Sequence, residues 1–63
     1  MILNHKTNGT DLYIIDFTPK GTNDRQEVGV YAKNRLDASN YLILNHIWGK
    51  QHSVRISTTA LLK

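Results

Sequence analysis

Apolar and polar residues alternate along three segments of the chain, which is the pattern of half-buried strands. The clearest is 11–17, where aromatic and β-branched residues fill every second position. Segment 27–32 follows the same rule with small aliphatic residues, and a third strand is expected over 53–61. The expected core-facing residues of these strands are Tyr13, Ile15, Phe17, Val28, Val30, Ala32, Val54, Ile56 and Ala60.

Between the second and third strands, the spacing of apolar residues changes to the period of a helix. Asn34 is suited to cap the first free amides, and Asp37, three residues later, suits the positive end of the helix dipole. Gly49 is a residue that often follows a helix end, so the helix is expected to run to about Trp48.

The apolar residues of this helix cover about twice the arc that one face of a small sheet requires. Two interpretations follow. The small core takes up all of these side chains, or part of them forms a surface for a dimer or another partner. The candidates for such a surface are Ile43, Leu44, Ile47 and Trp48.

Turn-forming residues separate the expected elements. Segment 18–26 is rich in them and is expected to be an exposed loop. Asn8-Gly9 suits a tight turn, so the apolar start 1–3 is expected to pair back as an edge strand. The sequence therefore predicts a single α+β domain over residues 1–63, in β-β-α-β order. Its antiparallel sheet has three or four strands, and one helix covers one face.

Composition narrows the class of protein. The chain has 63 residues and no cysteine, which excludes disulfides and thiolate metal sites. A domain this small buries a marginal core, so self-association or a partner is a plausible source of extra stability. The lack of cysteine, of a signal-like start and of a long apolar run predicts a cytoplasmic protein. The net charge of +3 comes from scattered basic residues rather than from a basic tail.

No arrangement of residues indicates catalysis. The three histidines, His5, His46 and His52, lack the spacing of metal ligands and are expected to be solvated. Asp11 and Asp16 are expected on opposite faces of one strand, so they make a poor acid–base pair. We therefore expect no enzyme, no metal and no cofactor.

Nucleic-acid binding is a second class to weigh. Tyr31 and Arg55 are expected on the face of the sheet away from the helix, and an open sheet face with aromatic and basic residues can stack bases. Lys33 and Arg35 flank the helix start, where they could contact phosphate. A solvated sheet face explains the same residues, so nucleic acid is not the favoured partner.

The strand 27–32, a capped helix with Ala38 four residues beyond the cap, and the segment 53–57 together resemble small bacteriophage host-takeover and anti-defence proteins. These include the podophage inhibitor of bacterial RNA polymerase and type I anti-CRISPR proteins of similar length. The resemblance implies a helix packed on a small antiparallel sheet, and Arg55 matches the basic residue of the final strand. A second strand arginine of the polymerase inhibitor has no counterpart here, because Ser57 holds that position.

These observations predict a small phage-type protein that binds a bacterial host or defence complex, such as RNA polymerase, and inhibits or modulates it in the host cytoplasm. The alternatives are a basic nucleic-acid-binding module and a self-associating structural protein. The expected partner-binding residues are Arg55, Tyr31, Lys33, Arg35, Ile43, Leu44, Ile47 and Trp48.

Overall fold

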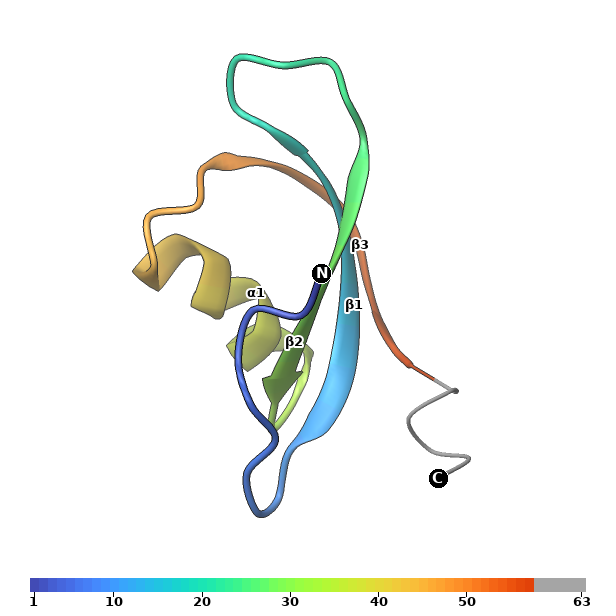
Figure 1. Ribbon diagram of the computed structural model, residues 1–63, viewed down its shortest axis with the longest axis vertical. Coiled ribbons are helices and arrows are strands. Elements are labelled where there is room, and N and C mark those ends of the chain that lie inside the picture. Colours follow the sequence, from blue (N-terminus) through green and yellow to red (C-terminus); the bar gives the residue numbers. More distant parts are fainter. Residues whose placement is uncertain (58–63) are drawn as a thin grey trace.

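The computed structural model describes residues 1–57, which form three strands and one helix (Figure 1). The elements are β1 (Asp11–Pro19), β2 (Gln26–Ala32), α1 (Arg35–Leu44) and β3 (Gly49–Ile56). The strands pair antiparallel in the order β2-β1-β3, and α1 lies on one face of the sheet (Figure 1). The predicted α+β fold and its β-β-α-β order are confirmed.

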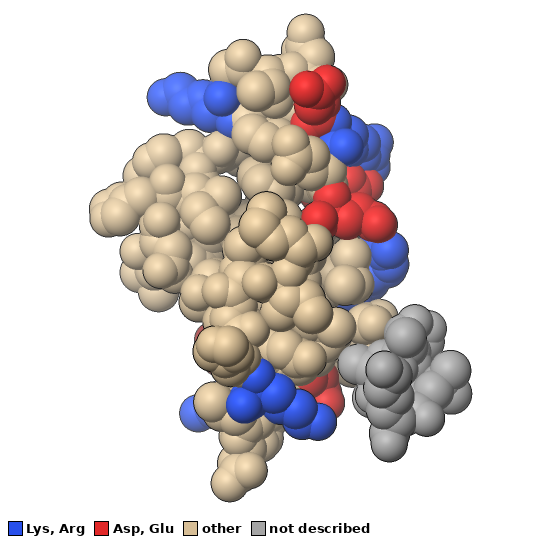
Figure 2. All heavy atoms as spheres, in the orientation of Figure 1, with Lys and Arg blue, Asp and Glu red and all other residues tan. Residues whose placement is uncertain are grey.

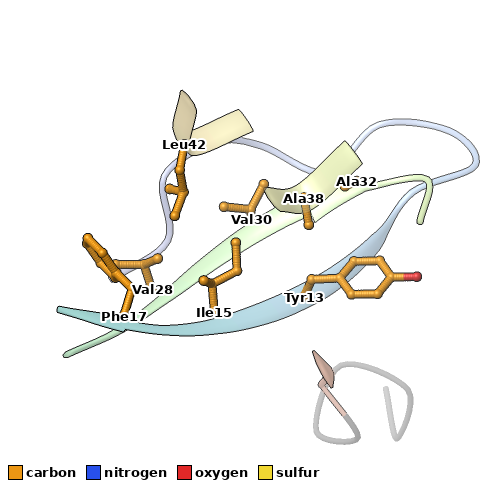
Figure 3. Close-up of a cluster of buried hydrophobic side chains, with 8 residues drawn as sticks. All are labelled: Tyr13, Ile15, Phe17, Val28, Val30, Ala32, Ala38 and Leu42. Atoms are coloured by element: carbon orange, nitrogen blue, oxygen red, sulfur yellow. The ribbon is translucent and has the colours of Figure 1, made fainter. Parts of the chain in front are cut away.

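The core lies between α1 and one face of the sheet (Figure 3). Every second residue from Tyr13 to Phe17 in β1 and from Val28 to Ala32 in β2 is buried there, as the alternation of the sequence predicts. Val54 and Ile56 of β3 pack against this core and stay partly exposed, because β3 is an edge strand. Ala60, also expected on this face, lies outside the described residues. The buried residues are Tyr13, Ile15, Phe17, Val28, Val30, Ala32, Ala38 and Leu42.

The third strand begins four residues earlier than the sequence predicts, at Gly49 rather than Ser53. β1 likewise continues to Pro19, which pairs with Gly49. The β1–β3 register shifts between Asp16 and Phe17, so the two strands continue beyond an irregularity. The first residues of β3 are mostly polar and carry no apolar alternation, so only pairing with β1 identifies them as a strand. The predicted end at Leu61 lies outside the described residues.

The expectation of an N-terminal edge strand is wrong. Ile2 forms an isolated parallel bridge to Gly29, on the outer edge of β2. The backbone of Gly29 accepts from Leu3 N at 2.8 Å and donates to the Met1 carbonyl at 2.7 Å. A Cβ at Gly29 would lie 3.1 Å from the Ile2 side chain, so glycine permits this close approach. The N-terminal segment therefore covers the edge of β2 without forming a strand.

The side chain of Asn4 binds the same edge of β2. Its amide oxygen accepts from Tyr31 N at 2.7 Å, and its Nδ2 donates to the Tyr31 carbonyl at 2.9 Å. One side chain thus satisfies both backbone groups that a neighbouring strand would otherwise bind.

The helix starts as predicted but ends earlier. Asn34 caps it by accepting from Asp37 N at 2.8 Å. It ends at Leu44 and not near Trp48, because His46 has a φ of 59°, in the left-handed region. Asn45 closes the last turn, with its backbone N and its side-chain Nδ2 both donating to the Tyr41 carbonyl, at 3.1 and 2.8 Å. Trp48 therefore belongs to the connection into β3.

Candidate functional site

The solvent-facing side of α1 carries three large apolar residues. Leu36, Ile43 and Leu44 are 67%, 48% and 76% exposed, at spacings i, i+7 and i+8. Ala38 and Leu42, which are buried, lie on the opposite side of the helix. We call Leu36, Ile43 and Leu44 the outer face of α1. Large apolar side chains that protrude together from one helix are typical of a contact surface.

Polar contacts on both flanks hold α1 in this rotation. On one flank, the Tyr41 hydroxyl donates to the Leu3 carbonyl at 3.2 Å. On the other, the Ser39 hydroxyl donates to Gln51 Oε1, and Gln51 Nε2 donates to the Ser39 carbonyl at 3.3 Å. Because these bonds tie the helix to the N-terminal segment and to β3, the outer face points away from the sheet.

The structure separates the four helix candidates that the sequence indicates. Ile43 and Leu44 lie on the outer face, whereas Ile47 is partly buried and packs against the core. Trp48 is exposed, but it lies beyond the end of α1. Sequence reasoning missed Leu36 as a surface residue. Leu36 lies on the same side of the helix as Ile43, and the sequence is equally compatible with that side facing the core.

Lys33 and Arg35 flank the start of α1, as expected, and both are exposed. Within residues 1–57, neither forms an ion pair. Two cations therefore stand beside the N-terminal end of the outer face. Asp37, in the first turn of α1, and Asp11, which pairs with Ala32, are acidic residues near them.

Arg55 and Tyr31 both lie on the sheet face away from α1, Arg55 opposite Ile14 and Tyr31 opposite Leu12. Arg55 Nη2 lies 2.7 Å from Glu27 Oε2, so its charge is already balanced. Tyr31 is half-buried. The two residues expected on this face are thus a half-buried ring and an arginine paired with Glu27.

A second ion pair lies on the same face. Arg25 Nη2 is 2.7 Å from Asp16 Oδ2, and the hydrogen bond from Arg25 holds the pKa of Asp16 below its ordinary value despite the opposing effect of burial. Figure 2 shows acidic and basic side chains following one another along the side of the molecule away from α1. A hollow of about 490 Å³ is lined mostly by residues of the three strands and of the N-terminal segment: Met1, Ile2, Leu12, Ile14, Glu27, Val28, Gly29, Arg55, Ile56 and Ser57.

A second hollow, of about 470 Å³, lies where β1 ends and β3 begins. We call it the Trp48 hollow. Trp48 is 54% exposed, and its ring centroid is 6.2 Å from that of His46. His52 Nε2 lies 2.8 Å from the Thr18 hydroxyl beside it. The lining residues are Thr18, Pro19, Lys20, Gly21, Thr22, Trp48, Gly49 and Lys50.

Within residues 1–57, no group of three or more potential ligand side chains could hold a metal ion. Over the same residues, no helix has the length and apolar character that a membrane crossing requires.

The chain matches no protein-family model, no curated protein and no solved structure.

Proposed function

We propose that this protein binds a bacterial protein complex and inhibits or retunes it, and that the outer face of α1 is the surface it uses. The observation that carries the proposal is the exposure of Leu36, Ile43 and Leu44 on the helix side opposite the core. In a chain of 63 residues with a negative mean hydropathy, three protruding large apolar side chains on one helix favour a binding role.

The spacing of these residues defines the chemistry of the partner. Side chains at i, i+7 and i+8 fit the mode in which an amphipathic helix lies in an apolar groove. Lys33 and Arg35 stand at the start of the helix without ion pairs in the described part of the chain. The partner that fits is a protein with an apolar groove whose rim is acidic at the end that meets these cations.

The resemblance of residues 27–57 to phage host-takeover and anti-defence proteins supports a bacterial target. In this proposal the chain acts as a stoichiometric ligand, so its effect on the target depends on occupancy of the groove. Arg55 has a smaller role than the sequence indicates, because Glu27 already pairs with it.

The test is capture from a bacterial lysate with a variant that removes the apolar face and keeps the helix. Leu36→Glu places an acid in the first turn, and Leu44→Lys places a base in the last turn, where none is present. Both changes suit the helix dipole and replace leucine with good helix formers. The double variant should stay folded and lose the protein that the unaltered chain captures, at equal loading.

A matched control carries the same two charges elsewhere. Asn8→Lys with Asn23→Glu leaves the net charge unchanged, and both residues are exposed in loops. This control should capture the partner as well as the unaltered chain does. Equal capture by all three proteins, or equal loss in both variants, would overturn the proposal.

A second copy of this chain is the competing occupant of the outer face. Sedimentation velocity at several concentrations separates the two cases. The proposal expects a monomer of 7.2 kDa throughout and a 1:1 complex with the captured partner. A dimer that dissociates in the Leu36→Glu/Leu44→Lys variant would assign the outer face to self-association instead.

A further inference from the structure

The Trp48 hollow lies outside the outer face of α1 and has its own architecture. β1 and β3 run side by side to their ends here, with Thr18 opposite Lys50 and Pro19 opposite Gly49. The pairing continues one step further, because Lys20 N donates to the Trp48 carbonyl at 2.9 Å. The indole ring and the two lysines are therefore brought together by the sheet, although 28 positions separate Lys20 from Trp48 in the chain.

Glycine at position 49 allows β1 and β3 to approach closely at this end of the sheet. A Cβ at Gly49 would overlap the Thr18 carbonyl oxygen and lie 3.0 Å from Pro19 Cα. The two backbones thus approach more closely than any other residue would allow. Trp48, which directly precedes Gly49, is exposed and belongs to the lining of the hollow.

The charge of the hollow is positive and not neutralised by the chain. Its lining includes Lys20 and Lys50 and no carboxylate. Among residues 1–57, neither lysine forms an ion pair, whereas the two arginines of the open sheet face are held by Asp16 and Glu27. Figure 2 shows basic side chains at the upper left, near the ends of β1 and β3, without acidic ones beside them in that view.

We propose that the Trp48 hollow binds single-stranded nucleic acid, with a base stacked on Trp48 and the neighbouring phosphates held by Lys20 and Lys50. An exposed aromatic ring beside unpaired cations is the combination that binds single strands without reading their sequence. Thr18 and Thr22 belong to the same lining, and their hydroxyls bond His52 Nε2 and the Pro19 carbonyl at 2.8 and 2.9 Å. This site is independent of the proposed protein partner.

A single strand fits better than a duplex. Base stacking on a protein ring requires a base that is free of its pair, and a duplex keeps its bases stacked inside. The hollow offers one ring and two cations, so it engages only a few nucleotides. The affinity for a single strand is therefore modest. It falls as salt rises, with a slope set by the two phosphate contacts.

The single tryptophan of the chain reports binding directly at the site. The probe is an unlabelled oligothymidine of about ten nucleotides at low salt, and the readout is Trp48 emission. Stacking of a thymine should quench this emission with a saturable curve. For two contacts, log affinity should fall against log salt with a slope of about −1.4.

Two variants of equal charge test the placement. Lys20→Gln with Lys50→Gln should weaken binding about tenfold or more at low salt and bring the slope near zero. Lys6→Gln with Asn8→Asp lowers the net charge by the same amount at exposed positions outside the hollow and should leave the quenching curve and the slope largely unchanged. All four altered positions are exposed, so the urea midpoint of each variant should match the unaltered protein.

Two further probes separate stacking from charge. An abasic strand of the same length should bind about tenfold or more weakly, because it offers phosphates without a base to stack. A duplex of the same sequence should quench less than the single strand. No quenching by the single strand at low salt overturns the proposal, as does equal binding of the abasic strand or equal loss of binding in the two charge variants.

Discussion

The packing of α1 predicts opposite effects on stability for the same substitution at two leucines that lie two positions apart. Leu42 is 1% exposed and Leu44 is 76% exposed. Replacing each with alanine is the same chemical change in the same helix. Leu42→Ala should severely destabilise the domain, and Leu44→Ala should leave it nearly unaffected.

The magnitudes follow from burial. Each substitution removes three carbon atoms, worth about 2.4 kcal/mol of transfer free energy when fully buried, and a residual cavity raises the cost at Leu42 to about 2–5 kcal/mol. At Leu44 only about a quarter of the transfer term applies, and alanine's higher helix propensity offsets part of it, leaving about 0–0.5 kcal/mol. A domain of this length has about 3–9 kcal/mol of total stability. Leu42→Ala therefore removes much or all of it.

Urea unfolding followed by far-UV circular dichroism measures both variants. The expected result is a large fall in the midpoint for Leu42→Ala, or an unfolded protein in buffer, beside a near-native midpoint for Leu44→Ala. Equal midpoints in the two variants would show that the rotation of α1 described above is wrong. A larger loss at Leu44 than at Leu42 would place the outer face in the core.

Three other changes probe the edges and charges of the sheet. Asn4→Ala removes both side-chain hydrogen bonds to the Tyr31 backbone, so it should lower the free energy of unfolding by about 1–3 kcal/mol and speed hydrogen exchange of the Tyr31 amide. Unchanged exchange would refute the edge contact. Gly49→Ala forces a Cβ against the facing backbone and should cost about 1–3 kcal/mol by urea unfolding, whereas a neutral effect would contradict the close approach. Because Arg25 lowers the pKa of Asp16, their pairing stabilises the fold above the ordinary carboxyl pKa and is lost as pH falls through the folded-state pKa. Asp16→Asn should therefore weaken the loss of stability measured between about pH 5 and pH 2, and an unaltered acid profile would exclude this contribution.

Strand alternation and the N-terminal helix cap could be predicted from the sequence because each is a local pattern. The face of β1 with Tyr13, Ile15 and Phe17 is more apolar than the face with Leu12, Ile14 and Asp16, so burial of the first face is favoured. Asn34 and Asp37 form the expected start of α1 from residues three apart. Fold class and element order follow from these local patterns.

The end of the helix and the start of β3 could not be predicted in the same way. His46 takes a left-handed conformation that its residue type favours only weakly, and apolar spacing continues past it to Ile47. Gly49 suggested a helix stop, but its small size serves the contact with the Thr18 carbonyl. The polar start of β3 is a strand because β1 extends far enough to pair with it.

The sequence does not determine which side of α1 packs on the sheet and which side forms the outer face. A helix that is apolar around most of its circumference has several sides that could face the sheet. Ala38 turns inward because a small side chain lets the helix approach the sheet closely, and Leu42 follows one turn later. The larger Leu36 and Leu44 consequently face solvent.

Site-specific photo-crosslinking in bacterial cells tests the central claim most directly. A photoreactive amino acid is placed at Leu44, on the outer face, and in a second protein at Asn8, an exposed loop position. The proposed function predicts a single crosslinked partner protein from position 44, with the same partner absent from position 8. Crosslinks from position 8 but not from position 44, or a product of twice the mass of this chain from position 44, would contradict it.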